Sequence, residues 1–167
     1  MRWDAAIHGR LVIPAKQRKA WLAAELDWKS VEGSAVLKGY ISGETVADMI
    51  YDDASFEEPN EFLKISWSGD ELLLQSFQSP AGFTENMVGF AAAWAAAARF
   101  GGTGELFTFA IGSRLGYRIT VADGKVVVAK LADDELDKLL EHPDAVALRE
   151  AIHKRGGPMA QKLAAAK

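Results

Sequence analysis

An apolar stretch at residues 84–100 has no charged side chain between Glu85 and Arg99. Its middle is almost entirely alanine, so other elements can approach it closely on most sides. The larger side chains recur at the spacing of one helix face, and they are Met87, Phe90 and Trp94. The run is shorter than the roughly 20 residues that a membrane-spanning helix needs. We therefore expect a central buried helix that Thr84 caps and residues 101–102 end, and no membrane span.

Residues 2–13 alternate between apolar and polar side chains, which predicts a half-buried strand. The inward parity comprises Trp3, Ala5, Ile7, Gly9, Leu11 and Ile13, and the solvent-facing parity holds Arg2, Asp4, His8 and Arg10. Pro14 suits the first turn of a helix, and residues 15–26 are predicted to form one. Trp21, Leu22 and Leu26 share one side of that helix.

Five further strands are predicted, at residues 62–67, 71–78, 105–111, 117–121 and 125–131. Turn residues at 68–70 and 123–124 predict two hairpins, whereas Pro80 and Gly82 are expected to break the pattern before the central helix. Two helices, 133–141 and 144–154, are expected to close the chain. The sequence thus predicts an α+β fold: one domain over residues 1–156, with a mostly antiparallel sheet of five to six strands, one long buried helix and outer helices. Residues 157–167 form a basic tail, either frayed or one more helical turn.

Residues 34–53 allow two interpretations. The first is a strand at 35–41 followed by a short helix at 44–53, whose inner side would hold Val46, Met49 and Ile50. The second is a hairpin that turns at Ser42 and Gly43, since glycine in a turn costs little strain. The sequence does not decide between a helix and a hairpin here.

The sequence lacks the residues that several kinds of functional site need. The chain has no cysteine, which excludes disulfides, thiolate metal sites and a cysteine nucleophile. Its three histidines, His8, His142 and His153, stand apart, and the sequence has no phosphate-binding loop, nucleophile elbow or dinucleotide fingerprint. We expect no cofactor and no metal. The net charge of −4 argues against a nucleic-acid partner, and the N-terminus lacks the apolar core of a signal peptide, so we expect a cytoplasmic protein.

The most distinctive feature for function is an acidic stretch. Residues 39–63 contain seven carboxylates and no lysine or arginine. Glu44, Asp48 and Asp52 are spaced by four and share a face in either a helix or a strand. Aromatic residues lie among the carboxylates, which is a composition typical of protein-binding surfaces. The predicted partner-binding residues are Glu44, Asp48, Tyr51, Asp52, Asp53, Phe56, Glu57, Glu58 and Glu61.

Clustered carboxylates also suit Mg²⁺ or Ca²⁺, but the ligand order of an EF-hand is not present. A second acidic group contains Asp133, Asp134, Glu135 and Asp137. It stands at a predicted helix start, where carboxylates cap free N–H groups and complement the helix dipole, so we expect a structural role for it.

In size, lack of cysteine, acidic composition, the acidic-aromatic segment 51–61 and the helix-to-glycine-to-strand passage 94–104, the chain resembles bacterial immunity proteins. Such proteins neutralise a cognate toxin, often a basic nuclease. The resemblance implies a non-enzymatic inhibitor whose acidic face occludes a basic protein partner such as a toxin domain. Two alternatives remain: an adaptor, secretion chaperone or small subunit of an assembly, and an enzyme that uses carboxylates as acid, base or metal ligands. The sequence does not indicate an oligomeric state.

Overall fold

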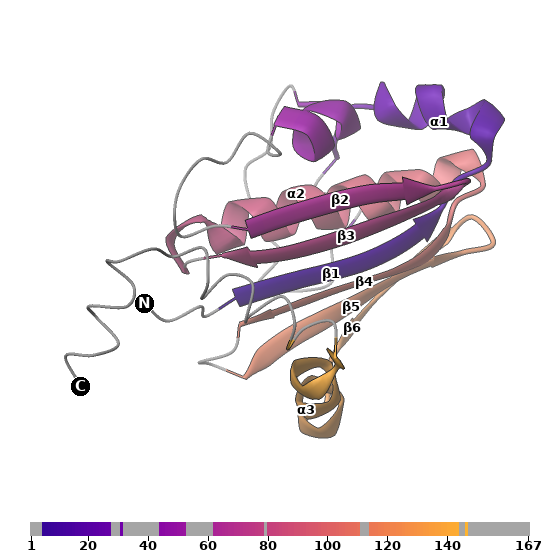
Figure 1. The fold of residues 1–167 in the computed structure, drawn as a ribbon. Helices are drawn as coiled ribbons and strands as arrows, with labels where there is room; N and C mark the ends of the chain where they lie inside the picture. Colours follow the sequence, from indigo (N-terminus) through magenta and orange to yellow (C-terminus); the bar gives the residue numbers. More distant parts are fainter. Residues whose placement is uncertain are drawn as a thin grey trace.

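The strands of the computed structural model form one antiparallel sheet in the order β2-β3-β1-β4-β5-β6 (Figure 1). The structure describes residues 5–27, 31, 44–52, 62–78, 80–110, 114–143 and 146. Within them the strands are β1 (Ala5–Val12), β2 (Phe62–Ser68), β3 (Glu71–Gln78), β4 (Thr103–Ala110), β5 (Leu115–Ala122) and β6 (Lys125–Lys130). The helical elements are α1 (Ala15–Leu22), η2 (Asp48–Asp52), α2 (Pro80–Ala97), η4 (Ala98–Phe100) and α3 (Asp133–Glu141). This architecture confirms the predicted α+β class.

The strands lie where the alternation placed them, and β2 to β6 begin and end within two residues of the predicted bounds. The hairpin between β5 and β6 turns at Asp123 and Gly124, whose φ angles of 52° and 71° are both left-handed. That geometry is the two-residue turn whose twist matches the twist of the flanking strands.

Strand β1 lies at the centre of the sheet, paired with β3 on one side and β4 on the other. The described members of its inward parity are buried as predicted, with Ile7 and Leu11 at 1% and 0% exposure, while the predictions for Trp3 and the side chain of Ala5 lie outside the described residues. The opposite parity is only partly exposed. Arg10 is exposed and pairs with Glu71 at 3.0 Å, but Ala6 is buried and His8 is half-buried. The prediction that His8 lies on a solvent-facing surface is therefore wrong in part, because α3 covers this end of the face.

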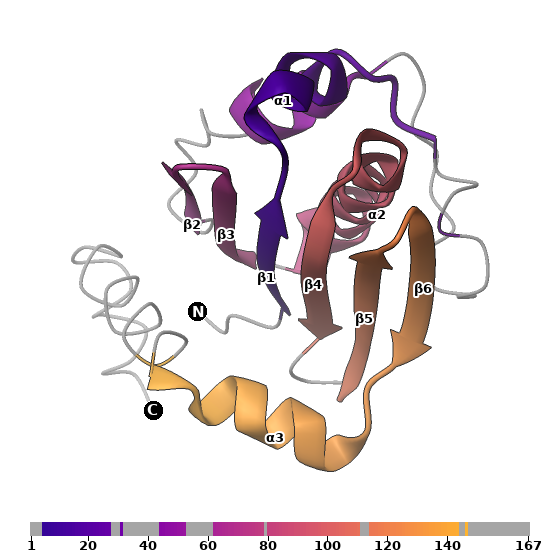
Figure 2. The same ribbon diagram turned by 90° about the vertical axis from the view of Figure 1, so that its right-hand side faces the viewer.

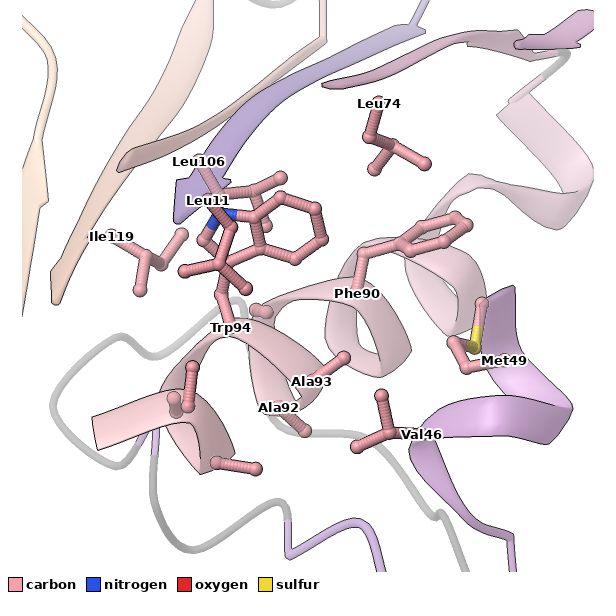
Figure 3. Close-up of a cluster of buried hydrophobic side chains, with 14 of the residues drawn as sticks. Leu11, Val46, Met49, Leu74, Phe90, Ala92, Ala93, Trp94, Leu106 and Ile119 are labelled. Carbon is pink, nitrogen blue, oxygen red and sulfur yellow. The ribbon is translucent and has the colours of Figure 1, made fainter. Parts of the chain in front are cut away.

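Helix α2 is the buried element of the fold, and every residue from Met87 to Ala97 is buried. Phe90 and Trp94 point from α2 toward Leu74 and Leu106 on the sheet (Figure 3). The predicted start at Thr84 is wrong, because the helix begins at Pro80. Proline has a helical φ and needs no N–H bond in a first turn, so at this position it begins the helix and does not interrupt the chain. The predicted end is confirmed by Gly101, whose φ of 71° is left-handed.

The indole of Trp94 lies directly against Gly9 on the central strand. A Cβ added at Gly9 would stand 2.6 Å from Trp94 Cζ2 and 2.6 Å from Leu106 Cδ1, so glycine makes this approach possible. The indole N–H is shared between the backbone carbonyls of Arg10 and Glu105, each 3.2 Å away. One side chain thus joins α2 to β1 and β4 at once.

Helix α1 packs on the α2 side of the sheet (Figure 2). Trp21 is fully buried, and its indole N–H donates to the carbonyl of Ala93 on α2 at 2.9 Å. The Arg18 guanidinium stacks over Trp67 of β2, 3.8 Å from the ring centroid. The helix ends at Leu22, four residues before the predicted end, because residues 24–26 instead bond to the segment that begins at Glu44.

Helix α3 has the predicted bounds and lies on the opposite face of the sheet (Figure 2). Leu136 packs in a small apolar cluster with Ala6 of β1, Phe109 of β4 and Leu131. A Cβ at Gly116 of β5 would stand 2.7 Å from Leu136 Cδ2, so this glycine allows the helix to approach the sheet.

Some predicted elements fall outside the described residues: the strand at 35–41, most of the helix at 144–154, and the tail at 157–167. The bounds predicted for the domain stay a prediction. Among the described residues, no helix is long and apolar enough to cross a membrane.

Replacing Gly9 with alanine is expected to lower the free energy of unfolding by about 1–3 kcal/mol, because the new methyl group overlaps Trp94 and Leu106. Trp94→Phe should also destabilise the protein. The Gly9→Ala/Trp94→Phe variant should lose less than the sum of the two single losses, since the smaller ring makes room for the methyl group. Urea unfolding of the four proteins measures the coupling, and strictly additive losses would contradict this contact.

Candidate protein-binding surface

Two acidic segments far apart in the sequence meet at one corner of the molecule. Glu25 forms a bridge with Thr45, the Leu26 N–H donates to the Glu44 carbonyl at 2.9 Å, and the Val46 N–H donates to the Ala24 carbonyl at 2.9 Å. Residues opposite each other in such a pairing have Cα atoms about 5 Å apart. The pairing therefore brings the backbone of Glu25, Leu26 and Asp27 next to the backbone of Glu44 and Thr45, and the side chains of Glu25, Asp27 and Glu44 are all exposed.

The segment from Thr45 onward is helical, which decides between the two sequence interpretations in favour of the helix. Its inner side is the predicted one, with Val46, Met49 and Ile50 all buried. Met49 packs into a gap on α2, where a Cβ added at Gly89 would stand 2.3 Å from the Met49 sulfur (Figure 3). The segment that begins at Glu44 is thus fixed to the core through α2.

Asp48 caps the start of this helical segment. Its carboxylate accepts hydrogen bonds from the Thr45 backbone N–H at 2.7 Å and from the Thr45 hydroxyl at 2.8 Å. The Thr45 hydroxyl in turn accepts from the Asp48 N–H at 3.2 Å, which completes a reciprocal capping box. The bond from the Thr45 N–H, followed by the bond from the Thr45 hydroxyl, lowers the pKa of Asp48 from its ordinary value. Asp48 therefore has a local structural role, whatever it contributes to a partner.

Tyr51 lies on the outer side of η2, a π-type turn over Asp48–Asp52, and is 49% exposed. We call the residues Glu25, Asp27, Glu44 and Tyr51 the acidic surface. An aromatic ring with one polar end, beside carboxylates that remain in water, can insert into a partner while the carboxylates orient the approach.

The predicted site residues are distributed as follows. Glu44 and Tyr51 lie on the acidic surface, Asp48 caps the segment between them, and Asp52 ends η2. The remaining predictions lie outside the described residues: Asp53, Phe56, Glu57, Glu58 and Glu61. Sequence reasoning missed Glu25 and Asp27, because arginine and lysine precede them and the charge of that part of the chain is positive. The usable signal was local: two acids flank the buried Leu26 in a strand-like alternation.

The acidic surface differs from the second acidic group in its counter-charges. On α3, Asp137 accepts from Arg114 at 3.0 Å, and this bond raises the pKa of the Arg114 guanidinium. Glu135 pairs with Arg118 at 3.1 Å and also accepts the Ala132 N–H at 2.9 Å, so the predicted capping role is confirmed there. Among the described residues, no ion pair involves Glu25, Glu44 or Asp48.

Within the described parts of the chain, no three His, Asp or Glu side chains are grouped so as to hold a metal ion. His8 and His142, far apart in sequence, come together with ring centroids 6.3 Å apart in an edge-to-face arrangement.

No protein-family model matches this chain, and neither the search of curated proteins nor the search of solved structures finds a match.

The capping box predicts a pH-dependent contribution to stability. The ionised form of Asp48 is favoured in the folded state, so the stabilisation is complete above its ordinary pKa of 3.8 and is lost as the pH falls through the lower folded value. We expect Asp48→Ala to unfold at lower urea than the wild type at neutral pH. This difference should shrink progressively below 3.8.

Glu44→Ala is the matched control, since Glu44 is a nearby carboxylate on the same segment and its side chain is exposed. Glu44→Ala should change the midpoint of urea unfolding little, both at neutral pH and in acid. A loss of stability in Asp48→Ala that stays constant down to strong acid would contradict the role of the ionised cap.

Proposed function

We propose that this protein is a non-enzymatic binding protein that acts as an immunity protein, with its acidic surface covering a basic toxin domain. The observation that carries the proposal is that two paired segments carry the exposed side chains of Glu25, Asp27, Glu44 and Tyr51. These residues come from two separate segments, and both segments are fixed to the buried core. A rigid surface of this kind loses little conformational freedom when it binds.

The two kinds of residue would have different tasks. Concentrated negative charge raises the rate of encounter with a cationic partner, by about tenfold or more at low salt. Exposed aromatic area adds contacts that are made only in the complex, and such contacts mainly slow dissociation. Inhibition would follow from occlusion of the partner's basic active surface, so it needs no catalytic group on this chain.

The partner is expected to be a basic protein encoded beside the gene for this chain. Expression of that neighbour alone should arrest the growth of a bacterial host, and co-expression of this chain should restore growth. A neighbour that is not toxic, or whose toxicity this chain does not relieve, would contradict the immunity function. An adaptor or subunit would bind the neighbour without any effect on growth.

Charge reversal tests the electrostatic part. Glu25→Lys/Glu44→Lys should lower the association rate with the purified partner by about tenfold at low salt, because it removes the steering field. The difference should shrink as salt is raised, since the Debye length falls from about 10 Å at 0.1 M to about 3 Å at 1 M. Stopped-flow or surface-based kinetics over a salt series would measure both effects.

The matched control for charge reversal is Asp134→Lys/Glu141→Lys, which changes the net charge equally at two exposed positions on α3. It should leave the association rate nearly unchanged. Equal effects from the two double variants would show that only net charge matters and would contradict a localised binding surface.

Tyr51→Ala tests the aromatic part. We expect dissociation to become about tenfold faster, as for a residue at the centre of a binding surface, while the association rate changes little. Because Tyr51 is 49% exposed, the stability of the free protein should hardly change. Val127→Ala removes a similarly exposed apolar side chain, 58% exposed on β6, and should leave the dissociation rate unaltered.

A further inference from the structure

The two edges of the sheet differ in their side chains. On the face turned away from α2, the edge strand β2 carries the exposed polar residues Lys64, Ser66 and Ser68. Charged and polar side chains of this kind keep an edge strand from pairing with other chains. The other edge is β6 (Figure 2), whose middle is three consecutive valines at residues 126–128. Val127 points away from α2 and is 58% exposed, so the middle of β6 does not have this protection.

The hydrogen bonds of β6 show which of its backbone groups point out of the sheet. Among the described residues, β6 pairs only with β5, and just beyond its end the Leu131 N–H donates to the Gly116 carbonyl at 2.9 Å. Because the direction of these groups alternates along an antiparallel strand, Val127 and Ala129 also bond toward β5. The residues whose N–H and C=O groups point away from β5 are therefore Val126, Val128 and Lys130. These groups can accept a further antiparallel strand.

We propose that β6 pairs antiparallel with β6 of a second copy of this chain, about a two-fold axis that passes Val127 and is perpendicular to the sheet. Such an axis keeps the corresponding faces of the two sheets on the same side, so only residues of equal parity lie opposite each other. Of the registers that remain, only this one sets every valine opposite a valine. Val127 faces Val127, and Val126 faces Val128 in both directions. The outward backbone groups of Val126 then bond to those of Val128 in the second copy.

The ends of β6 fit the same register. The strand begins and ends with lysine, and like charges directly opposite each other would destabilise the pairing. In this register Lys125 faces Ala129 of the second copy, and Lys130 faces Gly124, the neighbour of Asp123. The lysines therefore do not meet, and Lys130 has a carboxylate nearby. The pattern of β6 is thus complementary to itself, which favours a second copy over an unrelated strand.

Pairing would also remove apolar surface from water. Val126 and Val128 pack against the core and are only half-buried, and Val127 is exposed on the opposite face. A strand added beside them would cover part of all three side chains in each copy. The α2 helices of the two copies would lie on the same side of one continuous sheet. The residues of the acidic surface come from other segments, so this inference does not depend on the proposed function.

Disulfide trapping tests the pairing, because the cysteine-free chain allows single thiols to be placed. Val127 would form a non-hydrogen-bonded pair with itself, with Cα atoms about 4.5 Å apart, within the roughly 4.4–6.8 Å that a disulfide spans. Under oxidation, Val127→Cys should form a covalent dimer at least about tenfold faster than Val12→Cys. Val12 is the matched control, since it is 41% exposed on the same face of the central strand. Equal rates for the two variants would overturn the proposal.

A mixing experiment tests the register. Lys125→Cys and Ala129→Cys should each remain monomeric when oxidised alone, because neither position faces itself across the axis. When the two proteins are mixed, they should form a covalent heterodimer, which intact mass measurement distinguishes from either homodimer. Efficient homodimers of Ala129→Cys, or no heterodimer in the mixture, would overturn the register.

Sedimentation equilibrium tests the chain without a cross-link. The wild type should associate to a dimer, and Val127→Lys should weaken the dimer by about tenfold or more, because it sets two lysines opposite each other. Val12→Lys, which adds the same charge away from the edge, should leave the association unchanged. A wild-type chain that stays monomeric at every concentration would overturn the proposal, and the edge would then be left to another strand. Circular dichroism spectra confirm that each variant is folded.

Discussion

The indole of Trp94 on the backbone of Gly9 is the contact on which the layers of this molecule depend. It places the middle of α2 over the central strand, and its N–H bonds to carbonyls of β1 and β4 fix the helix relative to both strands. The neighbouring residue Ala93 then accepts from Trp21, which positions α1. Close packing tolerates little change in volume at such a point, so the small residues of α2 are as important as the large ones. Gly89, one turn earlier, admits Met49 and thereby fixes the segment that carries Glu44 and Tyr51.

Two acidic groups of similar composition have different surroundings in the fold. On α3, Asp137 and Glu135 pair with Arg114, which precedes β5, and Arg118 of β5, and Glu135 also caps the helix. The negative charges of these carboxylates are therefore paired with positive charges of the protein itself. At the other corner, a short pairing joins the segments that carry Glu25 and Glu44, and among the described residues neither of these carboxylates forms an ion pair, whereas Asp48 caps the helical segment. Exposed like charges repel each other only weakly in water, so the fold tolerates the second arrangement, and a cationic partner would relieve the repulsion.

Period-two alternation and turn chemistry are local signals, and they located β2 to β6 and the Asp123–Gly124 hairpin correctly. The errors arose where a residue's role depends on what lies beside it. Pro80 was interpreted as a break although it begins α2, since a proline before a helix and a proline in its first turn look alike in sequence. Residues 23–26 have helix-forming composition, but hydrogen bonds to Glu44 and Val46 hold the chain outside α1. His8 follows the polar parity of β1, and only the arrival of α3 makes it half-buried.

The candidate site shows the same division. Glu44, Asp48 and Tyr51 could be predicted, because their charge and aromatic character are properties of one continuous stretch. Glu25 and Asp27 could not, because they join the surface through a pairing between distant segments. By itself, the sequence determined the strands, the buried helix and its alanine-rich surface, since these depend on the periodicity of neighbouring residues. The tertiary structure alone decided the order of the strands, the helix at residues 46–52 and the partners of each carboxylate. Those outcomes depend on contacts between residues far apart in the chain, which local periodicity does not encode.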